Sequence, residues 1–172
     1  MKYERFEQLP VWQAAMTLAE KLYLLTDERA FGHLRELKDQ LRRAGLSVSN
    51  NIAEGFERGT TAELLSFLYI ARGSAGEVRS ILLFCQRLGV LASEISNFKS
   101  EISDLISLAE SCSRQIRAWA EHLQNTDIQG QRRLNDKTRQ AFAAQRSTEA
   151  FMQKLHDIRN AAEKPNTTHE PS

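Results

Sequence analysis

Side chains that usually catalyse reactions or bind metals are sparse in this sequence. The Glu-x-x-His pairs that di-iron four-helix bundles use are absent. Cys85 and Cys112 occupy apolar helical positions with no histidine on an adjacent turn, so we interpret them as reduced core residues rather than nucleophiles. No glycine-rich phosphate loop follows a strand. The histidines fall at predicted helix ends or in the C-terminal tail: His33, His122, His156 and His169. The sequence therefore predicts no enzyme, no metal, no cofactor and no small-molecule substrate.

Basic residues gather on one predicted helix and are the first candidates for binding. Arg35, Lys38 and Arg42 follow an i, i+3, i+7 spacing that places them on one helix face, and Arg43 is adjacent. One copy of the chain offers only a short basic strip, whereas a ring of copies would repeat the strip and multiply its field. Because arginine and lysine contact phosphates with little sequence preference, these four residues are candidate RNA or DNA contacts.

A second set of charges lies among apolar neighbours on two predicted helices. An unpaired charge in such surroundings is costly, so we expect these residues to form structural ion pairs between helices or between subunits rather than to carry acid–base chemistry. The candidates are Glu54, Arg72, Glu77 and Arg79.

The elements that must position these side chains are predicted to be helices throughout. Apolar residues recur at three- and four-residue steps over residues 10–27, 33–58, 61–88 and from Ser93 to about residue 124. Gly59 stands where a helix-ending residue with positive φ is expected. Thr60 and Glu63 match a capping box that opens the next helix. The short connection between the second and third helices predicts antiparallel neighbours, and hence an up-down antiparallel four-helix bundle.

The helix predicted over residues 61–88 is apolar on two faces. A surface helix needs only one apolar face, so a second one indicates burial against another subunit. This pattern predicts a homo-oligomer. The candidate oligomer contacts are Phe67, Ile70, Ile81 and Phe84.

Composition and charge divide the chain into a bundle and a tail. Of the 172 residues, 41% are hydrophobic and 26% are charged, with a net charge of +1, as in a soluble globular protein. Residues 1–126, the predicted bundle, carry a net charge of −1, and residues 127–172 carry +2. This charged tail is predicted to be partly helical, over residues 139–163, or disordered. We see no signal peptide and no apolar run long enough for a membrane span, so we expect a cytoplasmic protein.

Three ordered motifs resemble a known family. They are Phe6-Glu7-Gln8-Leu9-Pro10-Val11-Trp12, the stretch from Gln40 to Gly55, and Tyr69-Ile70-Ala71-Arg72-Gly73-Ser74 followed by Glu77. Together they resemble, over about residues 3–124, the bacterial four-helix-bundle proteins encoded by intervening sequences of 23S ribosomal RNA genes. The resemblance implies a bundle that assembles into a ring, a homopentamer in relatives. It also implies kinship with the accessory variability proteins of diversity-generating retroelements, which are basic barrels that bind nucleic acid and reverse transcriptase. The bundle of this chain is not basic.

The leading hypothesis is a non-enzymatic, ring-forming helical bundle that binds a macromolecular partner, with RNA or DNA as the candidate ligand. The alternative is a protein–protein interaction scaffold that binds no nucleic acid. The two differ in whether the basic strip forms a continuous surface or is neutralised by nearby acids such as Glu36 and Asp39.

Overall fold

The computed structural model describes residues 3–27, 31, 34–88, 98–125 and 136–162. A short 3-10 helix, η1 (Phe6–Gln8), precedes the α-helices, and the described residues contain no β-strand. The α-helices are α1 (Pro10–Asp27), α2 (Arg35–Glu57), α3 (Thr61–Leu88), α4 (Phe98–Gln124) and α5 (Asp136–Ala162). The prediction of an all-α chain is therefore confirmed.

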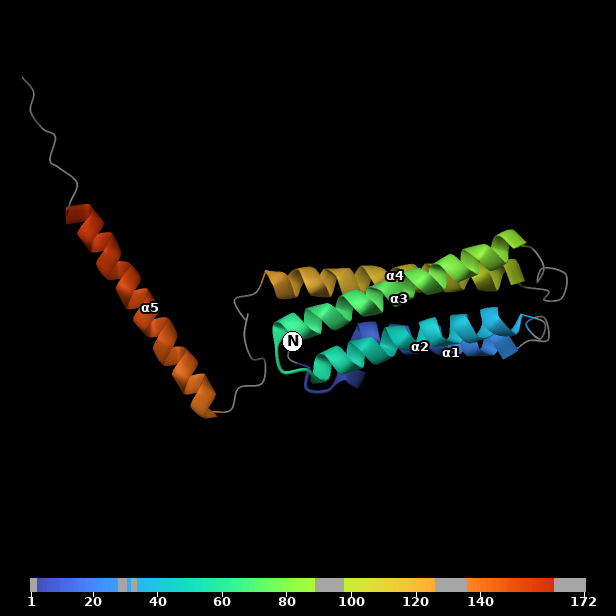
Figure 1. Ribbon diagram of the computed structural model, residues 1–172, viewed down its shortest axis with the longest axis horizontal. Helices are drawn as coiled ribbons and strands as arrows, with labels where there is room; N and C mark the ends of the chain where they lie inside the picture. The colour runs from blue at the N-terminus through green and yellow to red at the C-terminus, as the bar shows by residue number, and fades with distance from the viewer. Residues whose placement is uncertain (1–2, 28–30, 32–33, 89–97, 126–135, 163–172) are drawn as a thin grey trace, which may run out of the picture. The chain divides into compact units, whose positions relative to one another are not determined.

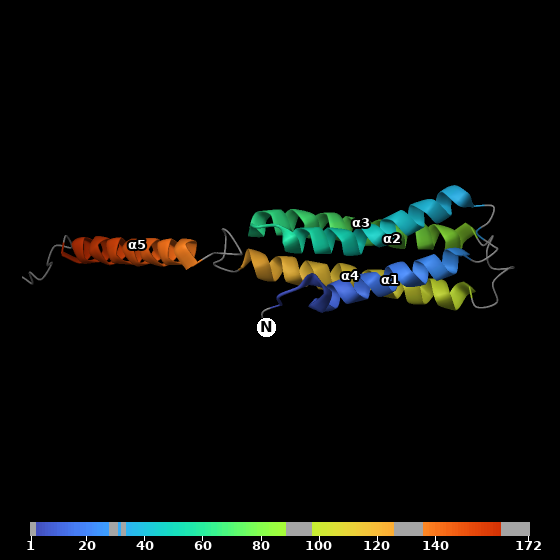
Figure 2. The same cartoon turned by 90° about the horizontal axis from the view of Figure 1, so that it is seen from below.

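The helices α1 to α4 form a bundle in which each helix lies beside two others. The pairs α1–α2, α2–α3, α3–α4 and α1–α4 pack along their lengths, which is the order of an up-down bundle (Figures 1 and 2). One continuous core fills the space between them, built from leucine, isoleucine, valine and alanine at the three- and four-residue steps that the sequence showed. This arrangement leaves the outer surfaces of α2 and α3 side by side.

Local chemistry sets the junction between α2 and α3. The backbone N–H of Glu63 donates to Thr60 Oγ1 over 3.2 Å, and the Thr60 hydroxyl donates to the Glu63 carboxylate over 2.8 Å. The predicted capping interaction is therefore confirmed. The predicted end of α2 is wrong in detail. Arg58 ends the helix in an extended conformation (φ −69°, ψ 151°), and Gly59 does not adopt positive φ.

Two glycines allow the helices to approach closely. A Cβ atom on Gly45 would lie 2.6 Å from Leu22 Cδ1 of α1, and one on Gly55 would lie 2.7 Å from Phe67 Cβ of α3. A larger residue at Gly55 would separate α2 from α3, because Phe67 Cβ moves only with its backbone, whereas one at Gly45 would displace the end of the Leu22 side chain. The small residues of the Gln40–Gly59 stretch thus serve packing within the bundle as well as its outer surface.

The helix boundaries otherwise differ from the predicted ones by small amounts. Helix α2 begins at Arg35 rather than at residue 33, and Leu34 is its N-cap. The predicted start of the fourth helix at Ser93 lies outside the described residues, as do the predicted bundle end at residue 126 and the predicted disordered end at residues 164–172.

The chain divides into two units, residues 1–132 and residues 133–172, and the second contains α5. Helix α5 exposes Phe151, Leu155 and Ile158 at i, i+4, i+7 positions, with Met152 beside them. A helix with one apolar stripe and polar residues elsewhere is amphipathic. The predicted helix at residues 139–163 corresponds to this element.

Candidate functional site

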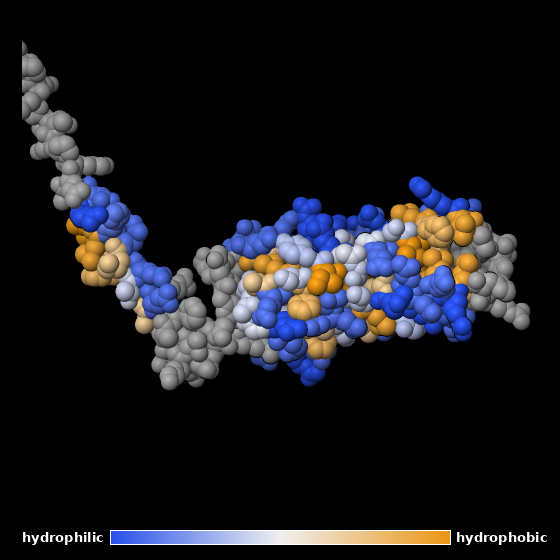
Figure 3. Space-filling view, in the orientation of Figure 1, coloured by the Kyte–Doolittle hydropathy of each residue, from blue (hydrophilic) through white to orange (hydrophobic). Residues whose placement is uncertain are grey.

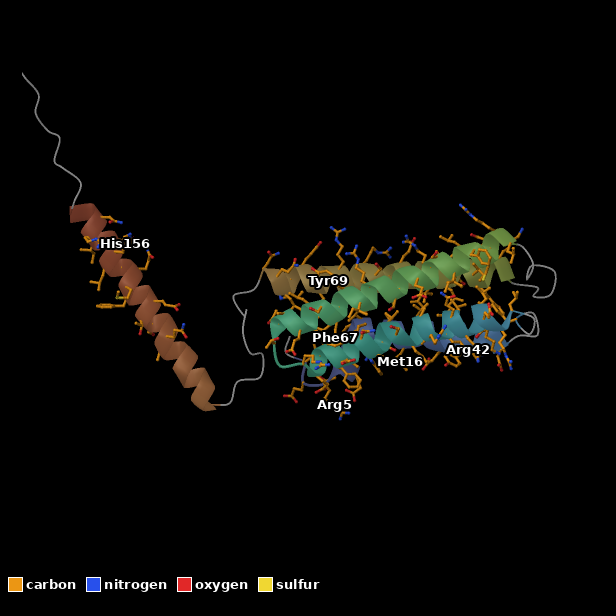
Figure 4. The ribbon with its side chains drawn as sticks, in the orientation of Figure 1. Arg5, Met16, Arg42, Phe67, Tyr69 and His156 are labelled. Carbon is orange, nitrogen blue, oxygen red and sulfur yellow. The ribbon has the colours of Figure 1, made fainter. Side chains whose placement is uncertain are left out.

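Arg42, one of the predicted nucleic-acid contacts, is held by α1. Its Nε donates to Thr26 Oγ1 over 2.7 Å and its Nη2 donates to the carbonyl oxygen of Tyr23 over 3.1 Å. The guanidinium carbon lies 4.4 Å from the centroid of the Tyr23 ring, and Nη2 lies 3.3 Å from Asp27 Oδ1. Figure 4 places Arg42 in the half of α2 that begins the helix. Arg42 therefore joins two helices, and its Nε and Nη2 donors are already bonded within the bundle.

The other three residues of the basic strip, Arg35, Lys38 and Arg43, differ in whether a carboxylate pairs with them. Lys38 Nζ lies 3.6 Å from Asp27 Oδ1, so the same carboxylate faces both Lys38 and Arg42. Arg35 and Arg43 are exposed, and neither has an ion-pair partner among the described residues. The strip is thus interrupted by Asp27, the last residue of α1, which the sequence did not single out because it lies on a different helix from the strip.

Arg43 and Glu54 line a shallow hollow of about 400 Å³ on the outer surface of α2. The hollow contains side chains that already bond to one another, since Asn51 Nδ2 donates to the carbonyl oxygen of Ser47 over 2.7 Å. Ser47 Oγ lies 2.9 Å from Ser74 Oγ and thereby links α2 to α3. These bonds fix the relative position of the two helices more than they offer a binding site.

The four predicted ion-pair residues are all exposed, and the structure does not bring them together. Glu54 pairs with Arg58 of its own helix, at i, i+4. Arg79 pairs with Glu110 of α4 over 3.4 Å. The Glu77 carboxylate accepts a hydrogen bond from Gln40 Nε2 over 3.2 Å. Surface pairs of this kind contribute about 0–1 kcal/mol each, so they orient side chains without greatly stabilising the fold.

Arg72, the fourth of these residues, lines a groove between α3 and α4. The groove has a volume of about 410 Å³, and its walls include Tyr69, Arg72, Arg79 and Ser113, with Gly73 and Gly76 on α3. Across the described ranges, Arg72 has neither a hydrogen-bond partner nor an ion-pair partner. The i, i+7 spacing of Arg72 and Arg79 is visible in the sequence, but Ser113 comes from α4, in a register that only packing sets.

The predicted oligomer contacts separate into buried and exposed residues. Ile81 is only 8% exposed and belongs to the core of the bundle, so it is unavailable to a second copy. Phe67 is half-buried, with Arg58 stacked 4.9 Å from its ring centroid. Ile70 and Phe84 are 52% and 51% exposed, and Leu88 is 46% exposed. Figure 3 shows apolar surface where α3 approaches its C-terminal end.

Ile70, Phe84 and Leu88 lie on one flank of α3, which we call the apolar flank. Ile70 and Leu88 are eighteen residues apart, which is about five full turns of an α-helix, and Phe84 is about four turns from Ile70. Glu77 lies between them and bonds to Gln40, so this flank borders α2. Arg79 follows Ile70 by about two and a half turns, so the arginines lie on the opposite flank, beside α4.

The acidic, histidine and cysteine side chains bear on metal binding and on nucleophilic chemistry. In the described part of the chain, no three His, Cys, Asp or Glu side chains come together as metal ligands. Cys85 and Cys112 are free and buried, and burial raises the pKa of each thiol to about 11, so both are uncharged at neutral pH. Among the helices that the structure describes, none is long and apolar enough to cross a membrane.

Comparison with known proteins supports the resemblance seen in the sequence motifs. A family model described as 23S rRNA-intervening sequence protein matches residues 7–118, which cover most of α1 to α4. No curated protein matches the chain.

Proposed function

Because the chain belongs to the 23S rRNA-intervening sequence protein family, we propose that it is a non-enzymatic helical scaffold that assembles with copies of itself into a ring and binds a macromolecular partner. The observation that carries this proposal is the apolar flank of α3, formed by Ile70, Phe84 and Leu88. Three large apolar side chains on one flank of a helix that is already buried on its other side favour burial against a second protein surface.

The size of the apolar flank bears on the form of the assembly. Each of its side chains is about half exposed, so burying it contributes roughly 1 kcal/mol. Association costs about 4–15 kcal/mol, so a single contact through three such side chains is weak. A closed ring gives every subunit two contacts and therefore stabilises an interface that is too small to hold an isolated dimer. This comparison favours the ring over an open pair.

Light scattering on the full chain tests the assembly. A mass several times the 19.6 kDa of one chain, unchanged over a range of micromolar concentrations, is the expected result. A mass of one chain under the same conditions would overturn the proposal of a ring. Mass and helix content should be measured in the same buffer, so that an aggregate of unfolded protein is not mistaken for the ring.

Nucleic-acid binding is the second candidate function, and two observations bear on it in opposite directions. Asp27 faces Lys38 and Arg42, which favours a protein–protein scaffold that does not use the basic strip. Arg72 has no partner among the described residues and lines a groove with further donors, which favours an anionic ligand at a different place. Retention of RNA or DNA at low salt, lost as salt rises, is the test of this second function.

A further inference from the structure

Three hydrogen-bond donors that line the groove between α3 and α4 are not committed to other groups: the Tyr69 hydroxyl, the Ser113 hydroxyl and the Arg72 guanidinium. Tyr69 Oη accepts a hydrogen bond from Gln124 Nε2 over 2.6 Å, which leaves its own proton available. Within the described part of the chain, Ser113 Oγ and the Arg72 guanidinium have no bonding partners. Arg79 stands at the same wall, about 10 Å along the helix axis from Arg72. A surface of this kind suits a ligand that brings acceptors.

The charge of the groove and its rim is positive. Arg72 and Arg79 line the groove, and the carboxylate that pairs with Arg79 there is Glu110 of α4. Glu110 is shared, since it lies 3.4 Å from Arg79 and 3.8 Å from Arg114. This carboxylate therefore neutralises only part of the positive charge, and Arg72 has no carboxylate partner among the described residues.

Gly73 and Gly76 have no side chains, so the α3 wall of the groove is formed there by the helix backbone. Glycine within a helix is less favourable than alanine, because it loses more conformational freedom on folding. A Cβ atom on either glycine would have no heavy atom within 4 Å, so packing inside the bundle does not require glycine there, in contrast to Gly45 and Gly55. The two glycines leave the helix backbone open to a ligand at the level of the arginines.

We propose that this groove is a phosphate-binding site for single-stranded nucleic acid. A phosphodiester backbone presents acceptors alone, which match the guanidinium and hydroxyl donors of the groove. The Tyr69 ring, 47% exposed at the groove, offers a face on which a base stacks. An acidic peptide would bring backbone N–H groups as well as carboxylates, and these N–H groups find few acceptors among the lining side chains. The inference rests on the proposed binding of a macromolecule and not on ring assembly.

The experiment measures the anisotropy of a fluorescent oligouridylate of about twelve nucleotides with the full chain at about 50 mM salt. Arg72→Gln combined with Arg79→Gln should raise Kd about tenfold and reduce the slope of log Kd against log salt by about 1–2. Arg43→Gln, on the outer surface of α2, is the matched control and should leave Kd unchanged. Equal effects of both variants, or an effect of Arg43→Gln alone, would overturn the assignment.

Substitutions that add no charge test the shape of the groove separately from its charge. Gly76→Gln should raise Kd by filling the groove, whereas Gly76→Ala should leave Kd nearly unchanged, because a single methyl group occupies little of the 410 Å³. An unchanged Kd in Gly76→Gln would overturn the site. The last measurement is competition between polyglutamate and the labelled RNA. If polyglutamate competes as well as the RNA at equal charge, the groove binds acidic polymers in general and the proposal fails.

Light scattering on the same samples separates this site from the assembly. If the oligomer mass is retained and the wild-type chain does not bind the oligonucleotide, the phosphate site is wrong while the scaffold stands. If Gly76→Gln changes the mass instead of the affinity, the groove is a contact between subunits and the phosphate site is likewise wrong. A monomeric wild-type chain that binds RNA through Arg72 would overturn the ring and support the groove.

Discussion

Arg42 donates from Nε to Thr26 Oγ1 over 2.7 Å, and this bond joins α2 to the last turn of α1. Thr26 is fully buried and its hydroxyl also donates to the carbonyl oxygen of Leu22 over 2.7 Å, so the oxygen is bonded on both sides. The residue that spacing marked as a ligand contact is thus part of a connection within the bundle.

The contrast between Arg42 and its neighbour Arg43 gives the first prediction. Arg42→Ala leaves Thr26 Oγ1 with an unpaired acceptor site and removes the stacking on Tyr23, so the free energy of unfolding should fall by about 1–3 kcal/mol. Arg43→Ala, exposed and without an ion-pair partner among the described residues, should change it by less than about 0.5 kcal/mol. Urea denaturation followed by circular dichroism measures both. Equal stability of the two variants would contradict the assignment of Arg42 to the bundle.

The second prediction concerns glycines with opposite surroundings. Gly55→Ala places a Cβ atom 2.7 Å from Phe67 Cβ, an atom that moves only with the backbone of α3, so it should destabilise the bundle by about 1–3 kcal/mol. Gly73→Ala meets nothing within 4 Å and should stabilise α3 by about 0.5–1 kcal/mol. Thermal unfolding of the two variants should therefore shift in opposite directions. Shifts of the same sign would show that α2 and α3 do not pack as closely as Gly55 indicates.

The apolar flank gives the third prediction. Ile70→Asp or Phe84→Asp places a charge at a proposed subunit contact and should reduce the light-scattering mass to that of one chain, with helicity retained because both residues are exposed in the bundle. Leu24→Asp is the control, since Leu24 is 72% exposed on α1, away from α3. If the mass persists in both α3 variants, the copies meet through another surface.

The buried thiols give the fourth prediction. Because burial raises the pKa of Cys85 and Cys112 from 9.0 to about 11, the folded chain should react with thiol reagents at pH 8 only as fast as it opens. In denaturant both thiols should react at once. Rapid labelling of the native chain would mean that the core between α3 and α4 is open to solvent.

The same shift in pKa fixes a pH dependence. The folded state keeps the thiol protons more tightly than the unfolded state, so the stabilising contribution is fully present below pH 9 and is lost as pH rises from 9 toward 11. Urea midpoints measured across this range should fall. In the double variant Cys85→Ala with Cys112→Ala, the thiol contribution to the fall of the urea midpoint between pH 9 and 11 should be absent. This holds whatever the variant does to stability at neutral pH.

By itself, the sequence determined the helices, their order and most of their boundaries. Apolar spacing and capping are local properties, and a short connection such as Arg58–Thr60 leaves neighbouring helices few ways to pack. The family followed from motifs that are likewise written in the sequence. Spacing also identified Ile70 and Phe84 as outward residues, although it grouped them with Ile81, which lies in the core.

Only the tertiary structure decided which charges are available to a ligand. The partner of Arg42 is sixteen residues away on another helix, and the register of two packed helices depends on side chains along the whole interface. For the same reason spacing could not show that Asp27 faces the basic strip, or that Ser113 of α4 meets Arg72 across a groove. A periodic pattern tells which face of a helix is apolar, but the contacts between faces are long-range. Because of such contacts, Arg42, predicted to bind a ligand, instead connects two helices of the bundle.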